Sequence, residues 1–275
     1  MSKKIATLVL NRNLKSITDT LVEHLQKFDG DVSDLYVIES GSALENCSKY
    51  KSYRADWTEA VEEGLRYPRG FNFGLSSLLR DGKYEQYDYF FLVCNDSLFM
   101  ESPTVGVLAE EMSSHSRIGI LSPCDASWGE YRIIPENQTR MFWYGNHIAW
   151  MVRRTFIDQI REMEKPDHLN FLYDGSNFRG YYLDVELIGK AYANNFCYAT
   201  TRKAMFREEA NLKERFSYIM RTDKTEENQD KMFLEGSQWL RKKYGFQSHW
   251  NMLRYVKSFY DQFLENNPEY LRFKT

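Results

Sequence analysis

The stretch that decides the fold is Tyr84-Glu-Gln-Tyr-Asp-Tyr-Phe-Phe-Leu-Val-Cys94-Asn95-Asp96-Ser97-Leu-Phe-Met100. Residues 87–93 are mostly aromatic and aliphatic, which is the pattern of a strand buried on both faces. The strand stops at Asn95-Asp96-Ser97, three residue types that favour turns. Ligands of open α/β sheets bind outside the carboxyl ends of the strands. Asp96 therefore either faces a binding site or only caps the turn.

Composition limits the classes of protein to consider. The chain has 275 residues, enough for one large α/β domain with an appendage or for two small domains. Its net charge of −3 argues against a nucleic-acid partner. Its apolar runs are too short for a signal peptide or a membrane span. The cysteines are scattered without metal-binding spacing and suit a reducing cytoplasm: Cys47, Cys94, Cys124 and Cys197.

The first forty residues follow a strand–helix–strand pattern. Ile5 to Leu10 is a continuous apolar run, and Leu35 to Ile38 is a second one. Between them, Ser16-Ile-Thr-Asp19 resembles a capping box at the start of an amphipathic helix. This is the pattern of a crossover in a parallel sheet. Both strands end in polar residues, Asn11-Arg12-Asn13 and Glu39-Ser40-Gly41-Ser42, which we expect at the same edge of the sheet.

The segments that flank the central stretch are less regular. We expect residues 43–68 to be loop with a short helix near Trp57, and Tyr67 to Gly74 to be a glycine-containing turn whose backbone can approach a ligand. Further along the chain we expect helices at 103–112 and 155–163, and a strand at 118–121.

Four of these motifs, in this order, resemble family 2 glycosyltransferases, and most closely the rhamnosyltransferase-like branch. They are Leu10-Asn11-Arg12-Asn13, Ile38-Glu39-Ser40-Gly41-Ser42, Arg69-Gly70-Phe71-Asn72-Phe73-Gly74 and Val93-Cys94-Asn95-Asp96-Ser97. The second half continues the resemblance. Residues 141–153 are similar to the strand that closes the acceptor side, and residues 181–192 to an acidic segment that starts a helix.

The resemblance implies an α/β GT-A-like fold with a mostly parallel sheet flanked by helices, over residues 1–207. Residues 208–275 then form a helical extension. The implied activity is inverting transfer of a sugar from a nucleotide-sugar donor to a hydroxyl of a polysaccharide or lipid-linked acceptor. Asp184 is the implied base, with His147 and Glu186 on the acceptor side. The residues implied around the donor are Asn11, Arg12, Glu39, Gly70, Asn72, Asn95, Asp96 and Arg207.

Departures from the family pattern concern the metal and the donor. Cys94 stands at the first position of the usual Asp-x-Asp motif, which leaves Asp96 as the expected ligand of Mg²⁺ or Mn²⁺. Glu39 replaces a common Asp, Leu183 replaces an acidic residue, and Arg207 stands where a late His is usual. Two alternatives therefore stay open. One is a non-catalytic nucleotide-sugar binder, and the other is a sugar-phosphate nucleotidyltransferase, although that class needs a glycine-rich loop after the first strand.

The C-terminal segment carries an aromatic and aliphatic stripe at helical spacing, formed by Trp250, Leu253, Val256, Tyr260 and Leu264. Lys242, Lys243, Arg254 and Lys257 flank it. The stripe is compatible with a peripheral contact to the inner face of a membrane. The preferred interpretation is a helix docked on the domain, or on a second subunit in a homodimer.

Overall fold

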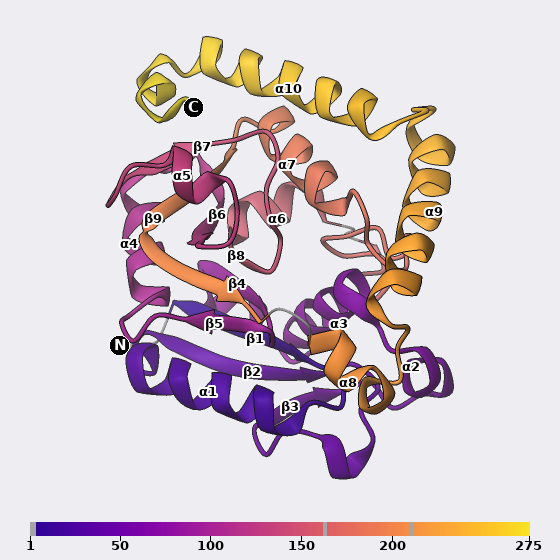
Figure 1. The fold of residues 1–275 in the computed structure, drawn as a ribbon. Coiled ribbons are helices and arrows are strands. Elements are labelled where there is room, and N and C mark those ends of the chain that lie inside the picture. Colours follow the sequence, from indigo (N-terminus) through magenta and orange to yellow (C-terminus); the bar gives the residue numbers. More distant parts are fainter. Residues whose placement is uncertain (1–3, 162–163, 210–211) are drawn as a thin grey trace.

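The structure is a computed structural model that describes residues 4–161, 164–209 and 212–275. Within these residues the chain forms one mixed nine-stranded sheet flanked by helices (Figure 1). The strands are β1 (Ile5–Asn11), β2 (Ser33–Glu39), β3 (Lys51–Arg54), β4 (Tyr89–Cys94), β5 (Ser97–Phe99), β6 (Ile118–Asp125), β7 (Thr139–Met141), β8 (Ala149–Arg153) and β9 (Cys197–Glu208). Their order is β3-β2-β1-β4-β8-β6-β9-β5, with β7 paired to β9.

Helices and 3-10 turns connect the strands. The helices are α1 (Lys15–Asp29), α2 (Thr58–Glu63), α3 (Arg66–Arg80), α4 (Val105–Ser114), α5 (Glu130–Ile133), α6 (Arg154–Ile160), α7 (Leu183–Ala193), α8 (Leu212–Met220), α9 (Thr225–Tyr244) and α10 (His249–Asn266). The 3-10 turns are η1 (Leu44–Asn46), η2 (Tyr84–Gln86) and η3 (Pro268–Phe273). In Figure 1, α9 and α10 run along the right and upper edges of the fold.

The predicted parallel crossover is confirmed. Strand β1 pairs in parallel with β2 on one side and with β4 on the other. Leu10 is level with both Ile38 and Cys94, so the polar residues that follow β1, β2 and β4 emerge at one edge of the sheet. The other half is mixed, because β8 is antiparallel to both β4 and β6 while β6 and β9 are parallel. The predicted α/β fold class is confirmed.

The prediction of a turn at 67–74 is wrong, because these residues belong to helix α3. Its two glycines lie on the face of the helix that packs against the sheet. A Cβ atom at Gly70 would lie 2.5 Å from Leu10 Cδ1, and one at Gly74 would lie 2.8 Å from Leu8 Cδ2. Glycine costs about 1 kcal/mol in a helix relative to alanine, and here it lets α3 sit directly on β1. Pro68 is tolerated because the first turn of a helix needs no intrahelical N–H donor.

Several element ends also differ from the predictions. Helix α1 starts at Lys15 with no side-chain cap, so the predicted capping box does not form. Asp19 instead accepts hydrogen bonds from Ser48 Oγ at 2.5 Å and from the Lys49 amide at 3.2 Å. The predicted loop at 43–68 contains the edge strand β3, and the predicted strand at 141–153 is divided between β7 and β8. The predicted end of α6 at residue 163 lies outside the described residues.

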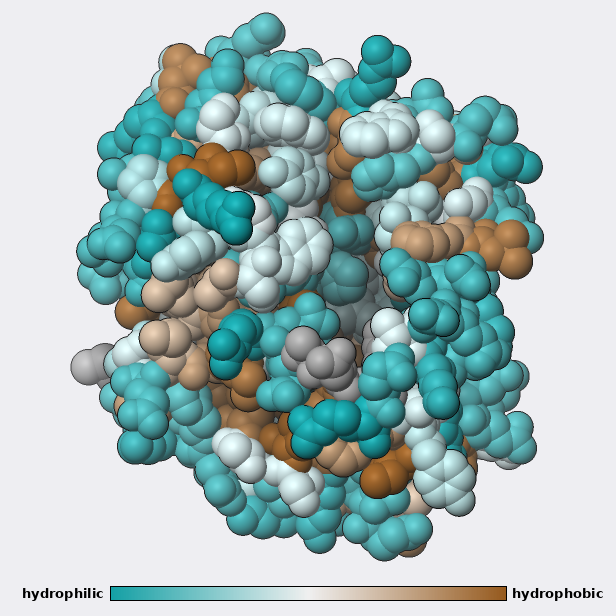
Figure 2. All heavy atoms as spheres, viewed as in Figure 1, coloured by the Kyte–Doolittle hydropathy of each residue, from teal (hydrophilic) through white to brown (hydrophobic). Residues whose placement is uncertain are grey.

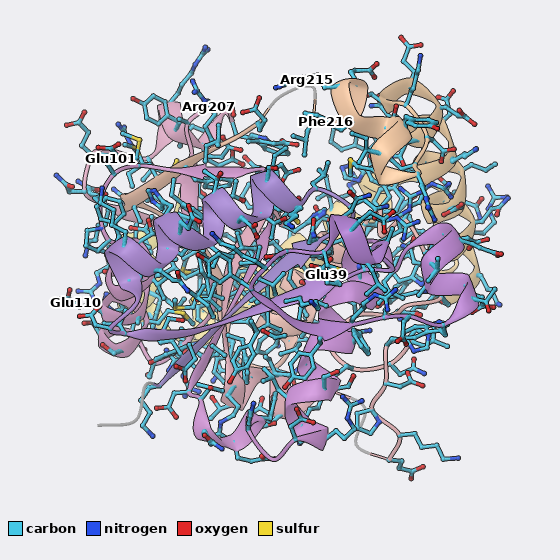
Figure 3. The ribbon with its side chains drawn as sticks, turned by 90° about the horizontal axis from the view of Figure 1, so that it is seen from below. Glu39, Glu101, Glu110, Arg207, Arg215 and Phe216 are labelled. Atoms are coloured by element: carbon cyan, nitrogen blue, oxygen red, sulfur yellow. The ribbon has the colours of Figure 1, made fainter. Side chains whose placement is uncertain are left out.

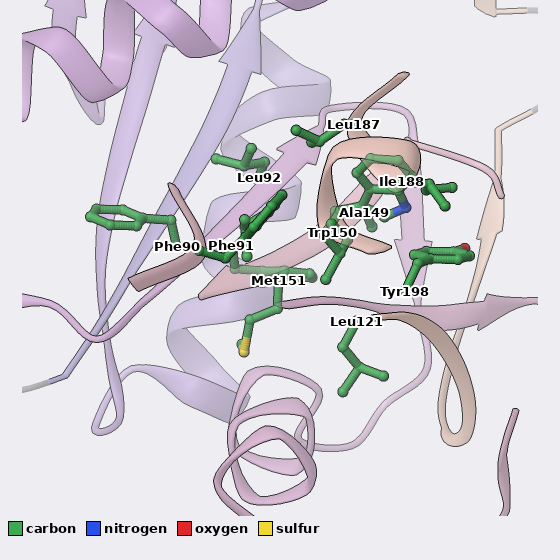
Figure 4. Packing of buried hydrophobic residues seen from close by; sticks show 14 of the residues in the cluster. Phe90, Phe91, Leu92, Leu121, Ala149, Trp150, Met151, Leu187, Ile188 and Tyr198 are labelled. Atoms are coloured by element: carbon green, nitrogen blue, oxygen red, sulfur yellow. The ribbon is translucent and has the colours of Figure 1, made fainter. Parts of the chain in front are cut away.

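One continuous hydrophobic core joins the sheet to the C-terminal helices. Figure 4 shows its centre, where Leu92 of β4, Trp150 of β8 and Tyr198 of β9 lie with Leu187 and Ile188 of α7. Trp239 of α9 and a row of buried side chains on α10 belong to the same core: Met252, Val256, Tyr260, Phe263 and Leu264. The stripe predicted in the C-terminal segment therefore docks on the domain along most of its length. No helix among the described residues is long and apolar enough to cross a membrane.

Candidate functional site

A cleft of about 450 Å³ opens at the carboxyl ends of β1 and β4. Figure 2 shows the surface hollowed near the middle of that view. The sheet contributes the residues that end β4, including Asn95 and Asp96, and the loop between β7 and β8 contributes Asn146 and His147. The start of α7 contributes Asp184, and α9 contributes Asn228. Residues distant in sequence thus meet at the sheet edge that the strand pattern predicted.

Two predicted carboxylates, those of Asp96 and Asp184, line this one cleft. Asp184 lies in the first turn of α7, directly after a backbone reversal at Tyr182, whose φ is +75°. His147 Nδ1 lies 3.8 Å from Asp184 Oδ2, and the two side chains are 34% and 22% exposed. The His147 ring in turn contacts the ring of Tyr67 of α3, with centroids 4.3 Å apart. Asp184 is therefore a partly exposed carboxylate that faces the cleft beside an imidazole.

Asn95 connects the cleft to a buried polar network. Its Nδ2 donates to Asn11 Oδ1 at 3.2 Å and to Thr18 Oγ1 at 2.9 Å. Asn11 Nδ2 donates to Glu39 Oε2 at 2.8 Å, and the Ser48 amide donates to Glu39 Oε1 at 2.7 Å. Glu39 is fully buried, and burial raises the pKa of its carboxyl group. Both Glu39 oxygens are thus engaged inside the protein (Figure 3), and Glu39 does not line the cleft.

Arg12 lines the cleft, but its guanidinium group is hydrogen-bonded to backbone carbonyls. It donates to the carbonyls of Ser40 at 2.7 Å, Ala60 at 2.8 Å and Met220 at 2.9 Å, among others. Burial, and then the nearby charges of Arg66 and Arg221, lower the pKa of Arg12 to about 10. Arg12 therefore ties together the segment after β2, helix α2 and the end of α8.

Asn72 and Gly70 were predicted near the donor, and the structure places both away from the cleft. Asn72 Oδ1 accepts from the amides of Leu172 and Tyr173, each at 2.9 Å, while its Nδ2 donates to the carbonyls of Tyr173 and His168. Asn72 thus holds the loop at 168–173 against α3. Gly70 has the packing role described above.

Glu186 and Arg207 also lie outside the cleft. Glu186 is buried beneath α9, where it accepts from Tyr244 Oη at 2.5 Å and pairs with Lys243 Nζ at 2.7 Å. Arg207 is exposed on β9, at the margin of the molecule in Figure 3. The next residue, Glu208, lines the cleft instead.

Three charged residues of the cleft were missed by sequence reasoning: Arg66, Arg179 and Glu208. Both arginines pack against the ring of Phe178. Arg179 binds the carboxylates of Glu235 and Asp223, which belong to α9 and the segment before it. For Glu208 the alternation of side chains along a strand becomes a signal only once Arg207 is known to point outward. For the two arginines the sequence offers no comparable pattern.

The side chains of the cleft suit a metal ion that bound phosphates would help to hold. No group of three or more His, Cys, Asp and Glu side chains suited to a metal occurs among the described residues. The cleft nevertheless presents the carboxylates of Asp96 and Glu208 and the amide of Asn95. Mg²⁺ and Mn²⁺ are commonly bound by one or two carboxylates together with substrate phosphates and waters. The donor set therefore suits these ions with a diphosphate present.

Comparison with known proteins identifies the fold. No protein-family model matches the sequence, and no curated protein does. Among solved structures, the mannosyltransferase PcManGT from Pyrobaculum calidifontis, in complex with GDP-Man and Mn²⁺, has a TM-score of 0.51 at 10% identity, over 97% of this chain and 88% of that one. GalNAc-T7 with UDP, GalNAc and Mn²⁺ has a TM-score of 0.57 at 9% identity, over 95% and 56%.

A third similar structure is S. aureus TarS 1-349 in complex with UDP-GlcNAc. Its TM-score is 0.51 at 13% identity, over 88% of this chain and 73% of that one. Of the structure of GalNAc-T7, this chain spans little more than half the length. These likenesses establish a GT-A-type glycosyltransferase fold.

Proposed function

We propose that the protein is an inverting glycosyltransferase that moves a sugar from a nucleotide-sugar donor to a hydroxyl group of a saccharide acceptor, either a polysaccharide or a lipid-linked glycan. The observation that carries the proposal is that Asp96, at the end of β4, and Asp184, at the start of α7, line one cleft at the sheet edge. Three similar structures hold a nucleotide or a nucleotide sugar, and two of them also hold Mn²⁺, which supports the donor class and the metal.

The donor half of the site lies around Asp96. Asn95 holds the end of β4 in place through Asn11 and Thr18. Asp96 and Glu208 would hold Mg²⁺ or Mn²⁺, which neutralises the charge that develops on the nucleoside diphosphate leaving group. Arg66 and Arg179 also line the cleft and offer N–H donors to the phosphates, although Arg179 is paired with Asp223 and Glu235. The fixed guanidinium group of Arg12 shapes the wall next to Ser40.

The acceptor half lies around Asp184. Its carboxylate accepts the proton of the acceptor hydroxyl group while that oxygen forms a bond to the anomeric carbon. The bond from the anomeric carbon to the diphosphate oxygen breaks, and the bonding electrons leave with the nucleotide. His147, 3.8 Å away, orients the carboxylate. A single displacement of this kind inverts the anomeric configuration.

The C-terminal segment extends the domain and also contributes residues to the cleft. We infer a division into a glycosyltransferase domain, 1–207, and a helical extension, 208–275. Met220, Thr222, Asn228 and Met232 of the extension line the cleft. Arg12 and Arg66 of the domain hydrogen-bond to Met220 and Thr222. The extension thus closes one side of the donor site.

A binder without catalysis is the second candidate, because Cys94 replaces the first acidic residue of the usual metal motif. One experiment separates the two. The melting temperature is measured with UDP, dTDP, GDP and CMP, each with and without Mn²⁺, and the matching nucleotide sugars are then assayed for turnover. A nucleotide at a hundred times its Kd adds about 2.7 kcal/mol, a shift on the order of 5–10 °C. A shift without turnover of any donor supports the binder, and the absence of any shift refutes both candidates.

A further inference from the structure

A second cavity, of about 610 Å³, lies beside the start of α10. Trp143, from the loop between β7 and β8, forms one wall. The first turns of α10 and the residue before it form the other: Ser248, Trp250, Asn251, Arg254 and Lys257. These residues take no part in the mechanism proposed above.

One segment of the chain lines both this cavity and the cleft, although the two have no lining residue in common. The loop between β7 and β8 places Trp143 in the cavity, and four residues later it places His147 in the cleft. On the other wall, the ring of His249 stacks on Tyr182 with centroids 5.3 Å apart, and lies 5.7 Å from the ring of Trp250. His249 is also close enough to Asp184 to feel its charge. The β7–β8 loop and His249 therefore connect the cavity to the part of the cleft that contains Asp184.

The lining of the cavity has the chemistry that saccharides need. Trp250 is 72% exposed, although an indole is among the most favourable side chains to bury. Trp143 presents a second ring, with the ammonium group of Lys257 5.3 Å from its centroid. Sugar rings place flat C–H faces on aromatic rings and direct their hydroxyl groups to polar side chains, here Ser248, Asn251 and Arg254. None of the described residues that line the cavity carries a carboxylate, so acidic sugars are accepted as well as neutral ones.

We propose that this cavity is an acceptor subsite, which binds the sugar units next to the one that carries the reacting hydroxyl group, with one ring stacked on Trp250. The inference rests on the proposed function and deepens it. The acceptor is then an oligosaccharide, or the end of a longer glycan, rather than a monosaccharide.

Calorimetric titration of the full chain tests the subsite. The probes are four tetrasaccharides, cellotetraose, maltotetraose, chitotetraose and a hyaluronan tetrasaccharide, each with its monosaccharide units. We expect at least one tetrasaccharide to bind. Trp250→Ala should weaken that binding about tenfold, the effect of losing a contact worth about 1.4 kcal/mol, while Trp250→Phe keeps most of it. Leu271→Ala, which removes another exposed apolar side chain, is the control and should change nothing.

Two results overturn the subsite: no tetrasaccharide binds the wild-type protein, or Trp250→Ala binds as tightly as wild type. The nucleotide melting shift is measured on the same variants. It should be unchanged in Trp250→Ala, because the proposed donor contacts lie in the cleft and Trp250 lies in the separate cavity. Loss of the oligosaccharide effect with an intact nucleotide shift refutes only the subsite. Absence of the nucleotide shift in a wild-type protein that binds a tetrasaccharide through Trp250 refutes only the glycosyltransferase.

Discussion

His147 Nδ1 lies 3.8 Å from Asp184 Oδ2, and the two residues come from different parts of the fold. His147 belongs to the loop between β7 and β8, and Asp184 to the first turn of α7. The ring of Tyr67, from α3, packs on the imidazole. Residues of three separate segments thus meet beside one carboxylate of the cleft, which is the arrangement that we expect of a positioned base.

Asp184→Asn should lower kcat by about 10²–10⁴-fold, the usual contribution of a general base. Its nucleotide Kd should stay near the wild-type value, because the donor contacts that we propose lie around Asp96. Steady-state rates and nucleotide titrations measure the two effects. Glu186→Gln is the matched control, since Glu186 is buried against Tyr244 and Lys243. It should lower the melting temperature and leave kcat within a few fold of wild type. A product with retained configuration contradicts the role of Asp184.

His147→Gln should lower kcat by about tenfold through loss of orientation. The donor Kd and the melting temperature should change little, because the side chain is partly exposed and its contacts are few. This split between kcat and binding distinguishes a positioning residue from a structural one. A loss as large as that of Asp184→Asn would mean that His147 itself takes the proton.

Asp96→Asn should abolish the part of nucleotide binding that depends on the metal. The measurement is the melting shift caused by the best nucleotide, with Mn²⁺ and with a chelator. Wild type should show a larger shift with Mn²⁺, by several degrees, and the variant should show the same shift in both conditions. The unliganded variant should melt like wild type. An unchanged Mn²⁺ effect in the variant would remove Asp96 from the metal site.

The sheet could be predicted from local sequence because its strands are continuous apolar runs that end in polar residues. The edge of the sheet that carries the site follows from β1, β2 and β4 alone. Helix α3 could not be predicted in this way. Gly70 and Gly74 read as a turn locally, whereas their packing on Leu10 and Leu8 is a tertiary contact that outweighs propensity.

The roles of polar residues were harder to predict than the positions of strands. Asp96 and Asp184 line the cleft, while their roles as metal ligand and base stay predictions. Asn72 and Glu39 stand in the same motifs yet point into the protein. The partners of Asn72 lie about a hundred residues further along the chain. Whether a side chain meets a ligand or a distant backbone depends on segments that a local pattern does not contain.

Asn72→Ala should destabilise the protein by about 3 kcal/mol, because it leaves the buried amides of Leu172 and Tyr173 without an acceptor. Denaturant unfolding followed by circular dichroism gives the free energy. Asn266→Ala, at an exposed position near the end of α10, should change it by less than about 0.5 kcal/mol. If Asn72→Ala instead weakens nucleotide binding at unchanged stability, the residue contacts the donor after all.

The stability of the α8–α9 segment should depend on acid through Asp223. Its carboxylate accepts from Lys231 Nζ at 2.9 Å and from Arg179 Nη2 at 2.8 Å. The hydrogen bond from Lys231, followed by that from Arg179, lowers the pKa of Asp223 to about 2. A lowered pKa in the folded state means that the unfolded chain takes up this proton first as the pH falls. The stabilisation is therefore complete above the unfolded pKa of about 4 and is lost as the pH falls toward 2.

The test compares wild type with Asp223→Asn in urea unfolding at pH 7, 5 and 3. The free-energy difference between them should be equal at pH 7 and 5 and smaller at pH 3, because Asp223 of the unfolded chain is then largely protonated and folding has to release that proton. Glu226→Gln, at an exposed position in the first turn of α9, serves as the control for net charge. A difference that stays constant down to pH 3, or that grows, would show that the ion pairs of Asp223 with Lys231 and Arg179 do not hold the segment. Protonation of Asp223 at low pH should also release the Arg179 side chain, which lines the cleft and is held by Asp223.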